Sequence, residues 1–224
     1  MNRAAGRLVL FETESDYCAF ESLLASAQQR TDMRIIAYCL MPNHWHLLLW
    51  PAADGAITRF LHWLTTVHAL RWRADHDAVG RGAVYQSRFK AIPVQSDRHL
   101  LVVKRYIERN ALRANLVERA EAWSWCSASL TRYERMPRLA QSPIEMPSDW
   151  LEIVNAPQTA QELSAVRQSL AHAEPFGDAD WRETLRDVAA WRPIGRPKRG
   201  RTPFATFATS DRDEKGVRPL FRGG

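Results

Sequence analysis

The chain has 224 residues, of which 46% are hydrophobic, enough to build a packed core. Its formal net charge of +6 favours a polyanionic partner, although a surplus of arginine is a modest signal by itself. We expect neither a membrane span nor a secretory signal, because the longest apolar runs are far too short. The three cysteines lack metal-site spacing, which is typical of a protein from a reducing cytosol.

Helical and strand patterns alternate in the first half of the chain. Hydrophobic periodicity predicts helices over residues 14–30 and 57–75, and strands over residues 7–11, 33–40, 45–50 and 83–94. A helix capped by Ser96 or Asp97 follows the last strand. This order predicts an α+β fold: a ferredoxin-like antiparallel sheet with helices on one face, plus a helical C-terminal extension.

The second half of the chain is predicted to form an extension of the first. A proline-rich loop over residues 137–147 precedes short helices predicted over residues 149–155, 158–173 and 178–191. We therefore divide the chain into an α+β domain at 1–135, a helical extension with a basic end at 136–200, and a disordered tail at 201–224. The basic end contains a Gly-Arg-Pro core like that of an AT-hook, but so short a match favours generic phosphate binding through Arg196, Lys198 and Arg199.

Two histidines stand two positions apart in the strand that begins near residue 45. Alternate side chains of a strand share a face, so His44 and His46 can converge on one metal ion. A strand with two polar residues on its solvated side is the alternative, because a lone histidine pair is a weak signal.

The helix after Asp97 carries a second unusual group. Leu100, Val103, Ile107 and Ala111 form its core stripe, while Tyr106 and Asn110 share a neighbouring stripe one turn apart. An amphipathic tyrosine whose hydroxyl reaches water would explain this stripe without any chemistry.

Taken together and in this order, these segments resemble a known family. The matching runs are AYCLMPNHWHL at 37–47, VYQSRFK at 84–90, RYIERNALRANLVERA at 105–120 and WSW at 123–125. They resemble the REP-associated tyrosine transposases, a branch of the single-tyrosine HUH transposases. The resemblance covers about residues 14–135 and implies a cytoplasmic enzyme that cuts and rejoins single-stranded or hairpin DNA. Repeats scattered in its own genome are candidate substrates.

The resemblance assigns roles to four residues. His44 and His46 match the HUH metal pair, Tyr106 matches the nucleophile that forms a 5′-phosphotyrosine, and Asn110 matches the polar residue that completes the metal site. The family implies Mg²⁺ or Mn²⁺ as cofactor, whereas imidazole ligands alone would favour zinc, copper or nickel. The oligomeric state stays open, as does the question of whether a second copy supplies the tyrosine.

Two groups of residues are candidates for binding DNA. Gln86, Arg88 and Lys90 would share one face of the strand over 83–94, which could equally be a solvated outer face. Arg109 and Arg113 flank Asn110 on the tyrosine helix and could contact the phosphate backbone.

One departure from the family concerns its first strand, which carries a Tyr-His-Val-like run. This chain starts inside the segment that follows that strand, so we expect a missing central strand and unpaired backbone in its neighbours. The expectation is an upstream start codon or a decayed copy. The alternative function is therefore a non-catalytic nucleic-acid-binding relic of such a transposase.

Overall fold

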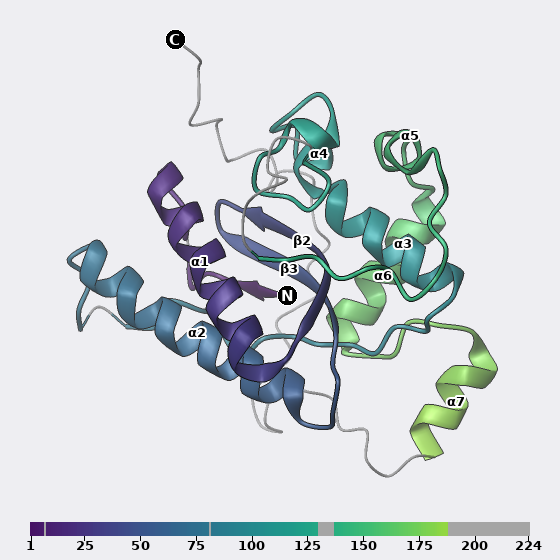
Figure 1. The fold of residues 1–224 in the computed structure, drawn as a ribbon, viewed down its shortest axis with the longest axis horizontal. Helices are drawn as coiled ribbons and strands as arrows, with labels where there is room; N and C mark the ends of the chain where they lie inside the picture. The colour runs from purple at the N-terminus through teal and green to yellow at the C-terminus, as the bar shows by residue number, and fades with distance from the viewer. Residues whose placement is uncertain (7, 81, 130–136, 188–224) are drawn as a thin grey trace.

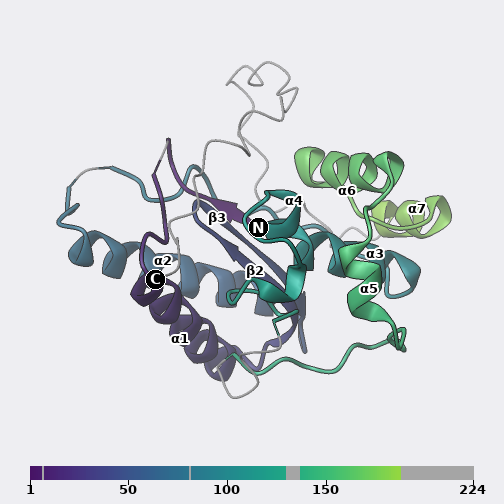
Figure 2. The ribbon, with the colours of Figure 1, turned by 90° about the horizontal axis from the view of Figure 1, so that it is seen from above.

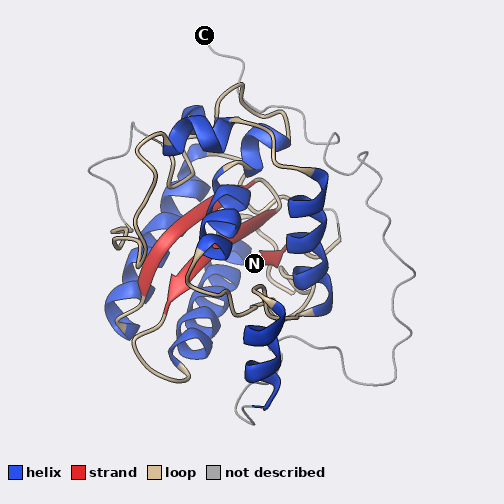
Figure 3. Ribbon diagram, turned by 90° about the vertical axis from the view of Figure 1, so that its right-hand side faces the viewer, coloured by secondary structure: helices blue, strands red, loops and turns tan. Residues whose placement is uncertain are grey.

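The structure is a computed structural model, and it describes residues 1–6, 8–80, 82–129 and 137–187. Three antiparallel strands form its sheet in the order β1-β3-β2. These strands are β1 (Asn2–Arg3), β2 (Arg34–Met41) and β3 (His44–Trp50). The α+β class and the antiparallel sheet are confirmed (Figure 3).

The helices lie on both faces of the sheet rather than on one. The helices α1 (Glu14–Thr31) and α2 (Ala56–Asp75) cover one face, and α3 (Arg98–Glu108) crosses the other (Figure 2). A strand exposes alternate residues to the two sides, so two cores form: one around Trp45 and Phe60, the other around Cys39 and Ile107. The second core includes the side of β3 that carries His46.

Local capping explains why the long helices begin where they do. Thr13 caps α1 through a reciprocal capping box with Asp16, and the Asp97 side chain accepts from the backbone N–H of His99 at the start of α3. Helix α3 stops at Glu108, and a short helix, α4 (Asn110–Arg113), follows after Arg109. The predicted continuous helix is therefore broken between Tyr106 and Asn110.

Residues 1–5 take the central position that we expected to be vacant. Asn2 pairs with Trp45 and Arg3 with His44, while on the other side the N–H of Ala5 donates to the carbonyl of Val84. This pairing covers only the first two residues of β3. The central strand is therefore short rather than absent among the described residues.

The strand predicted over residues 83–94 does not form as a regular strand. Gln86 N–H bonds to the Arg3 carbonyl and Lys90 N–H to the Met1 carbonyl, so the segment advances four residues while its partner advances two. The excess residues bulge outwards and break the alternation of faces. The short strand predicted over residues 7–11 is also not found: Leu10 and Phe11 are buried and donate their N–H groups to the Pro42 carbonyl, while residue 7 lies outside the description.

The C-terminal extension packs against the tyrosine helix (Figure 1). It contains α5 (Trp150–Asn155), α6 (Ala160–His172) and α7 (Ala179–Asp187), preceded by the short 3-10 helix η1 (Ala120–Ala122). Arg105 and Arg109 donate to the backbone carbonyls at the end of α5, which lack partners within the helix. In the part of the chain that the structure describes, no helix could cross a lipid bilayer.

Candidate metal and tyrosine site

Strand β3 brings the two predicted metal ligands side by side. The ring centroids of His44 and His46 lie 5.2 Å apart. The Nδ1 atom of His44 is 2.7 Å from the Asn43 side-chain oxygen, and this contact assigns the proton to Nδ1 and leaves Nε2 for a ligand. His46 is buried, and its ring has no hydrogen-bond partner among the described residues.

Both histidines are neutral at physiological pH. Burial, followed by the charges of Arg3 and Arg113, lowers the pKa of His44 to about 3. Burial also holds the pKa of His46 well below its usual value, and His44 and the neighbouring cations add to the effect. The neutral imidazole is the form that binds a metal ion, so this environment keeps the pair ready for one.

Helix α3, which carries Tyr106, packs on β2 and β3 and brings the tyrosine next to this histidine pair. The Tyr106 ring centroid lies 5.7 Å from that of His46, and the tyrosine is 7% exposed. Its hydroxyl makes no hydrogen bond within the described ranges. Asn110 is 3% exposed, and its side-chain nitrogen is buried without a hydrogen-bond partner. Tyr106 on α3 thus lies beside the histidine pair of β3, and Asn110 is the first residue of α4, just beyond the end of α3.

Arg113 connects the tyrosine to the asparagine. Its guanidinium carbon lies 4.3 Å from the centroid of the Tyr106 ring, and one guanidinium nitrogen lies 3.4 Å from the backbone oxygen of Tyr106. The other terminal nitrogen donates to the side-chain oxygen of Asn110. Arg113 therefore contacts the nucleophile candidate and the third metal-ligand candidate at once.

This donor set suits a divalent ion whose remaining ligands are hard oxygens. His44 and His46 offer nitrogens and Asn110 an amide oxygen, all of them neutral. The three groups thus fit a metal ion that also receives oxygens from water and phosphate.

A second cluster of possible ligands lies at the start of α3. Asp97, His99 and Asp178 place one ligand atom each within 4.8 Å of one another. However, His99 already contacts both acids, through Nδ1 to Asp97 at 2.8 Å and Nε2 to Asp178 at 3.7 Å. The positive end of the helix dipole also disfavours a cation there. An imidazole bridging two carboxylates accounts for this cluster.

Comparison with known proteins bears on the whole site. Residues 3–110, a little under half of the chain, match the family model described as "Transposase IS200 like". The match supports the single-tyrosine transposase family. Neither curated proteins nor solved structures gave a significant match.

The family match carries a coarse function with it. It indicates transposase-like processing of DNA, with DNA as partner and endonuclease or transposase activity, and the family is typically metal-dependent. The matched range contains both histidines, Tyr106 and Asn110.

A cleft lies along the edge of β3, beside the candidate site. Its volume is about 620 Å³, and His46 and Tyr106 both line it. The free edge of β3 beyond Trp45 forms one wall, and residues 90–94 form the opposite wall. The cleft therefore lies directly beside two of the candidate site residues, His46 and Tyr106.

The predicted DNA-binding residues fall into different environments. Gln86 and Arg88 are exposed, Lys90 is half-buried at the cleft, and Arg109 is turned toward the carbonyls of Val154 and Asn155. Arg113 lies inside the site. Arg196, Lys198 and Arg199 lie outside the described residues.

Sequence reasoning missed a buried carboxylate that fixes the tyrosine helix. Glu108 is 1% exposed and accepts from Lys104 Nζ, Ser127 Oγ and Trp150 Nε1, each at 2.7 Å. The i,i+4 spacing of Lys104 and Glu108 was the available signal, but it more often marks a solvated helix face.

A second missed network lies behind β3. The Tyr85 hydroxyl accepts from Trp45 Nε1 at 3.1 Å and lies 2.7 Å from Nδ1 of the buried His68. Burial lowers the pKa of His68 to about 4, so this imidazole is neutral and can accept the hydroxyl proton. The network fixes Trp45, which stands between the two candidate metal ligands.

Proposed function

We propose that this chain is a metal-dependent DNA strand transferase of the REP-associated tyrosine type, acting on single-stranded or hairpin DNA. The observation that carries the proposal is the convergence of Tyr106 with His46, at 5.7 Å between ring centroids, next to the second histidine, His44. A hydrolase without a covalent intermediate would not need the tyrosine.

The reaction begins with the Tyr106 oxygen attacking the scissile phosphorus. The phenol proton leaves to solvent, a new O–P bond forms, and the bond from phosphorus to the 3′ oxygen breaks. That oxygen takes a proton, and the 5′ end remains as a phosphotyrosine. Because the ester keeps the energy of the broken bond, the 3′ hydroxyl of another DNA end can reverse the step and join the strands.

His44, His46 and Asn110 would hold Mg²⁺ or Mn²⁺. When bound, such an ion neutralises phosphate charge, orients it for in-line displacement and stabilises the leaving oxygen. The chain's own residues position the partners: Asn43 fixes the tautomer of His44, and Glu108 fixes the helix that carries Tyr106.

We assign this activity to a catalytic domain at residues 1–135 and treat residues 136–200 as an extension that supports it. Arg105 and Arg109 bind the end of α5, which ties the extension to the tyrosine helix. We propose that the DNA backbone is contacted by exposed Gln86 and Arg88 and by Lys90 at the cleft. The basic residues Arg196, Lys198 and Arg199 are further proposed contacts.

Formation of a covalent adduct tests the proposal. The protein is incubated with a labelled single-stranded hairpin and Mg²⁺ or Mn²⁺, and denaturing electrophoresis reveals DNA attached to protein. Tyr106→Phe should abolish the adduct while DNA binding persists, and His44→Ala should abolish it and weaken binding of Mn²⁺. Cleavage that survives Tyr106→Phe would identify a hydrolase instead.

The alternative is a DNA-binding protein that no longer cuts. Tight hairpin binding with neither adduct nor cleavage in any metal would support this alternative.

A further inference from the structure

The Arg113 guanidinium contacts or influences every candidate reacting group. It covers the Tyr106 ring, donates to the Asn110 side-chain oxygen, and contributes positive charge at both His44 and His46. The helix break at Arg109 precedes α4, from whose last residue the Arg113 side chain reaches back to Tyr106.

The Asn110 amide is held in one orientation by this contact. Its oxygen faces Arg113, while its nitrogen is buried without a hydrogen-bond partner. Turning the amide over would set an N–H donor against a guanidinium, which has only donors. The oxygen that would serve a metal ion therefore already accepts a hydrogen bond from Arg113.

Electrostatics gives a reason for the hydrogen bond between Arg113 and Asn110 to break when DNA binds. Arg3 pairs with His44 in the sheet and Arg113 lies against Tyr106, so an added cation meets repulsion from both guanidinium groups. A DNA phosphate supplies the missing negative charge. It is also a better partner for a guanidinium than an amide oxygen, because it is anionic and accepts two parallel hydrogen bonds.

We propose that Arg113 is a gate that couples DNA binding to metal binding. In the DNA-free protein it holds the Asn110 oxygen and covers the Tyr106 ring; with DNA bound, its guanidinium moves to the substrate phosphate and releases both. This inference rests on the proposed function. Since coupling between two binding sites is reciprocal, DNA and metal each strengthen binding of the other.

Binding of Mn²⁺, measured by titration calorimetry in a Tyr106→Phe background that cannot cleave, tests the gate. A single-stranded hairpin should tighten Mn²⁺ binding about 10-fold, within the usual range of coupled sites. Arg113→Met keeps an apolar stem over the ring but removes charge and donors. We expect this variant to bind Mn²⁺ several-fold more tightly without DNA, and the hairpin to add less than about twofold.

Arg71→Met is the matched control, because it removes the same charge from an exposed position of α2. This control should bind Mn²⁺ as tightly as the parent does, and the hairpin should tighten its Mn²⁺ binding by the same factor. If the parent binds Mn²⁺ through His44 but Arg113→Met leaves the Mn²⁺ affinity unchanged both with and without the hairpin, the gate is overturned and the proposed function stands. If His44→Ala does not weaken Mn²⁺ binding, the proposed metal site itself fails, and the gate with it.

A second measurement covers the case in which Arg113→Met does not fold. In the parent protein, NMR contacts between Arg113 and the ring at position 106 should be present without DNA and lost when hairpin and Mg²⁺ are added. Contacts that persist unchanged in the complex would overturn the gate.

Discussion

Trp45 and Tyr85 are joined by a hydrogen bond from the indole nitrogen to the phenol oxygen, which ties the strand of the histidine pair to the segment beside it. The same phenol oxygen contacts His68 of α2. The hydroxyl of Tyr85 therefore serves structure, while the hydroxyl of Tyr106 has no partner within the described residues.

Removing the Tyr85 hydroxyl should lower stability, whereas removing the Tyr106 hydroxyl should abolish activity. Tyr85→Phe leaves a buried indole donor and a buried imidazole without partners, so it should lower the free energy of unfolding by about 2 kcal/mol. Tyr106→Phe should leave that free energy nearly unchanged and abolish adduct formation. Urea denaturation and the adduct assay check both variants; equal stability of the two would contradict the assignment.

Acid should destabilise the protein below about pH 6.5, the ordinary histidine pKa. The folded-state pKa is lowered to about 3 at His44 and about 4 at His68, so between these values and 6.5 the unfolded chain binds more protons. The free energy of unfolding then falls as pH falls, by at most about 1.4 kcal/mol per pH unit for each such histidine.

Urea denaturation at a series of pH values measures this slope. His68→Gln removes one titrating group and should make the dependence on pH shallower. A variant as pH-sensitive as the parent would contradict the contribution of His68.

Loss of the Glu108 carboxylate should be severe, because it leaves Lys104 buried without its counter-ion. We expect Glu108→Ala to cost about 3–5 kcal/mol and Glu108→Gln, which can still accept from Trp150, to cost less. Glu118→Ala, at an exposed position, is the control and should stay within about 0.5 kcal/mol. Equal effects at positions 108 and 118 in denaturant unfolding would refute the role given to Glu108.

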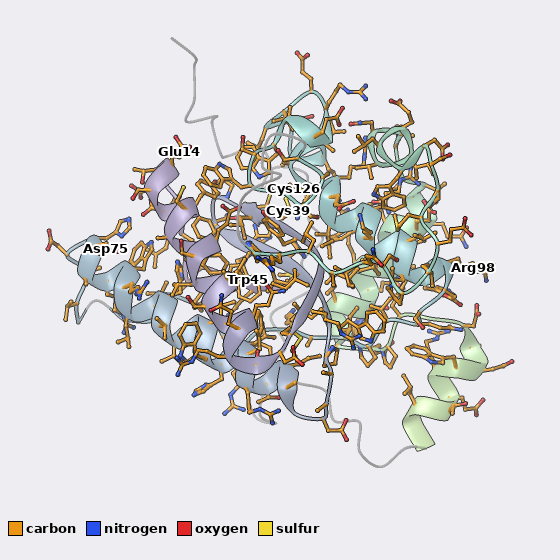
Figure 4. All side chains as sticks on the ribbon, viewed as in Figure 1. Glu14, Cys39, Trp45, Asp75, Arg98 and Cys126 are labelled. Carbon is orange, nitrogen blue, oxygen red and sulfur yellow. The ribbon has the colours of Figure 1, made fainter. Side chains whose placement is uncertain are left out.

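The three cysteines should differ sharply in reactivity. Cys39 and Cys126 lie side by side as a buried cross-strand pair (Figure 4), and burial raises the pKa of the Cys126 thiol well above its usual value. Cys18 is exposed. A thiol reagent should therefore modify Cys18 at least about 100-fold faster than the other two in the folded protein. Cys18→Ser should remove the fast phase, and a fast phase that remains would show that the buried pair is accessible.

The features predicted correctly from sequence are governed by local rules. Asp97 was recognisable as one of two candidate helix caps because capping depends on neighbouring residues, and the shared face of His44 and His46 follows from the two-residue period of a strand.

The features that were not predicted depend on distant contacts. The segment over 83–94 is irregular because its pairing with residues 1–5 covers few positions, and its own alternation of side chains carries no sign of that. The helix break at Arg109 contains neither glycine nor proline. Consequently the contact of Arg113 with both Tyr106 and Asn110 could not be deduced from helical spacing, although their nearness in sequence was plain.

The buried carboxylate of Glu108 also constrains how this chain can diverge. Three donors from separate parts of the sequence meet on it: Lys104, Ser127 and Trp150. Loss of Lys104 leaves the carboxylate without its counter-ion, and loss of Ser127 or Trp150 removes one of its hydrogen bonds, so changes at these positions should be tolerated best in combination. Exchange of the C-terminal extension between relatives should therefore fail unless the matching residues of the tyrosine helix are exchanged with it.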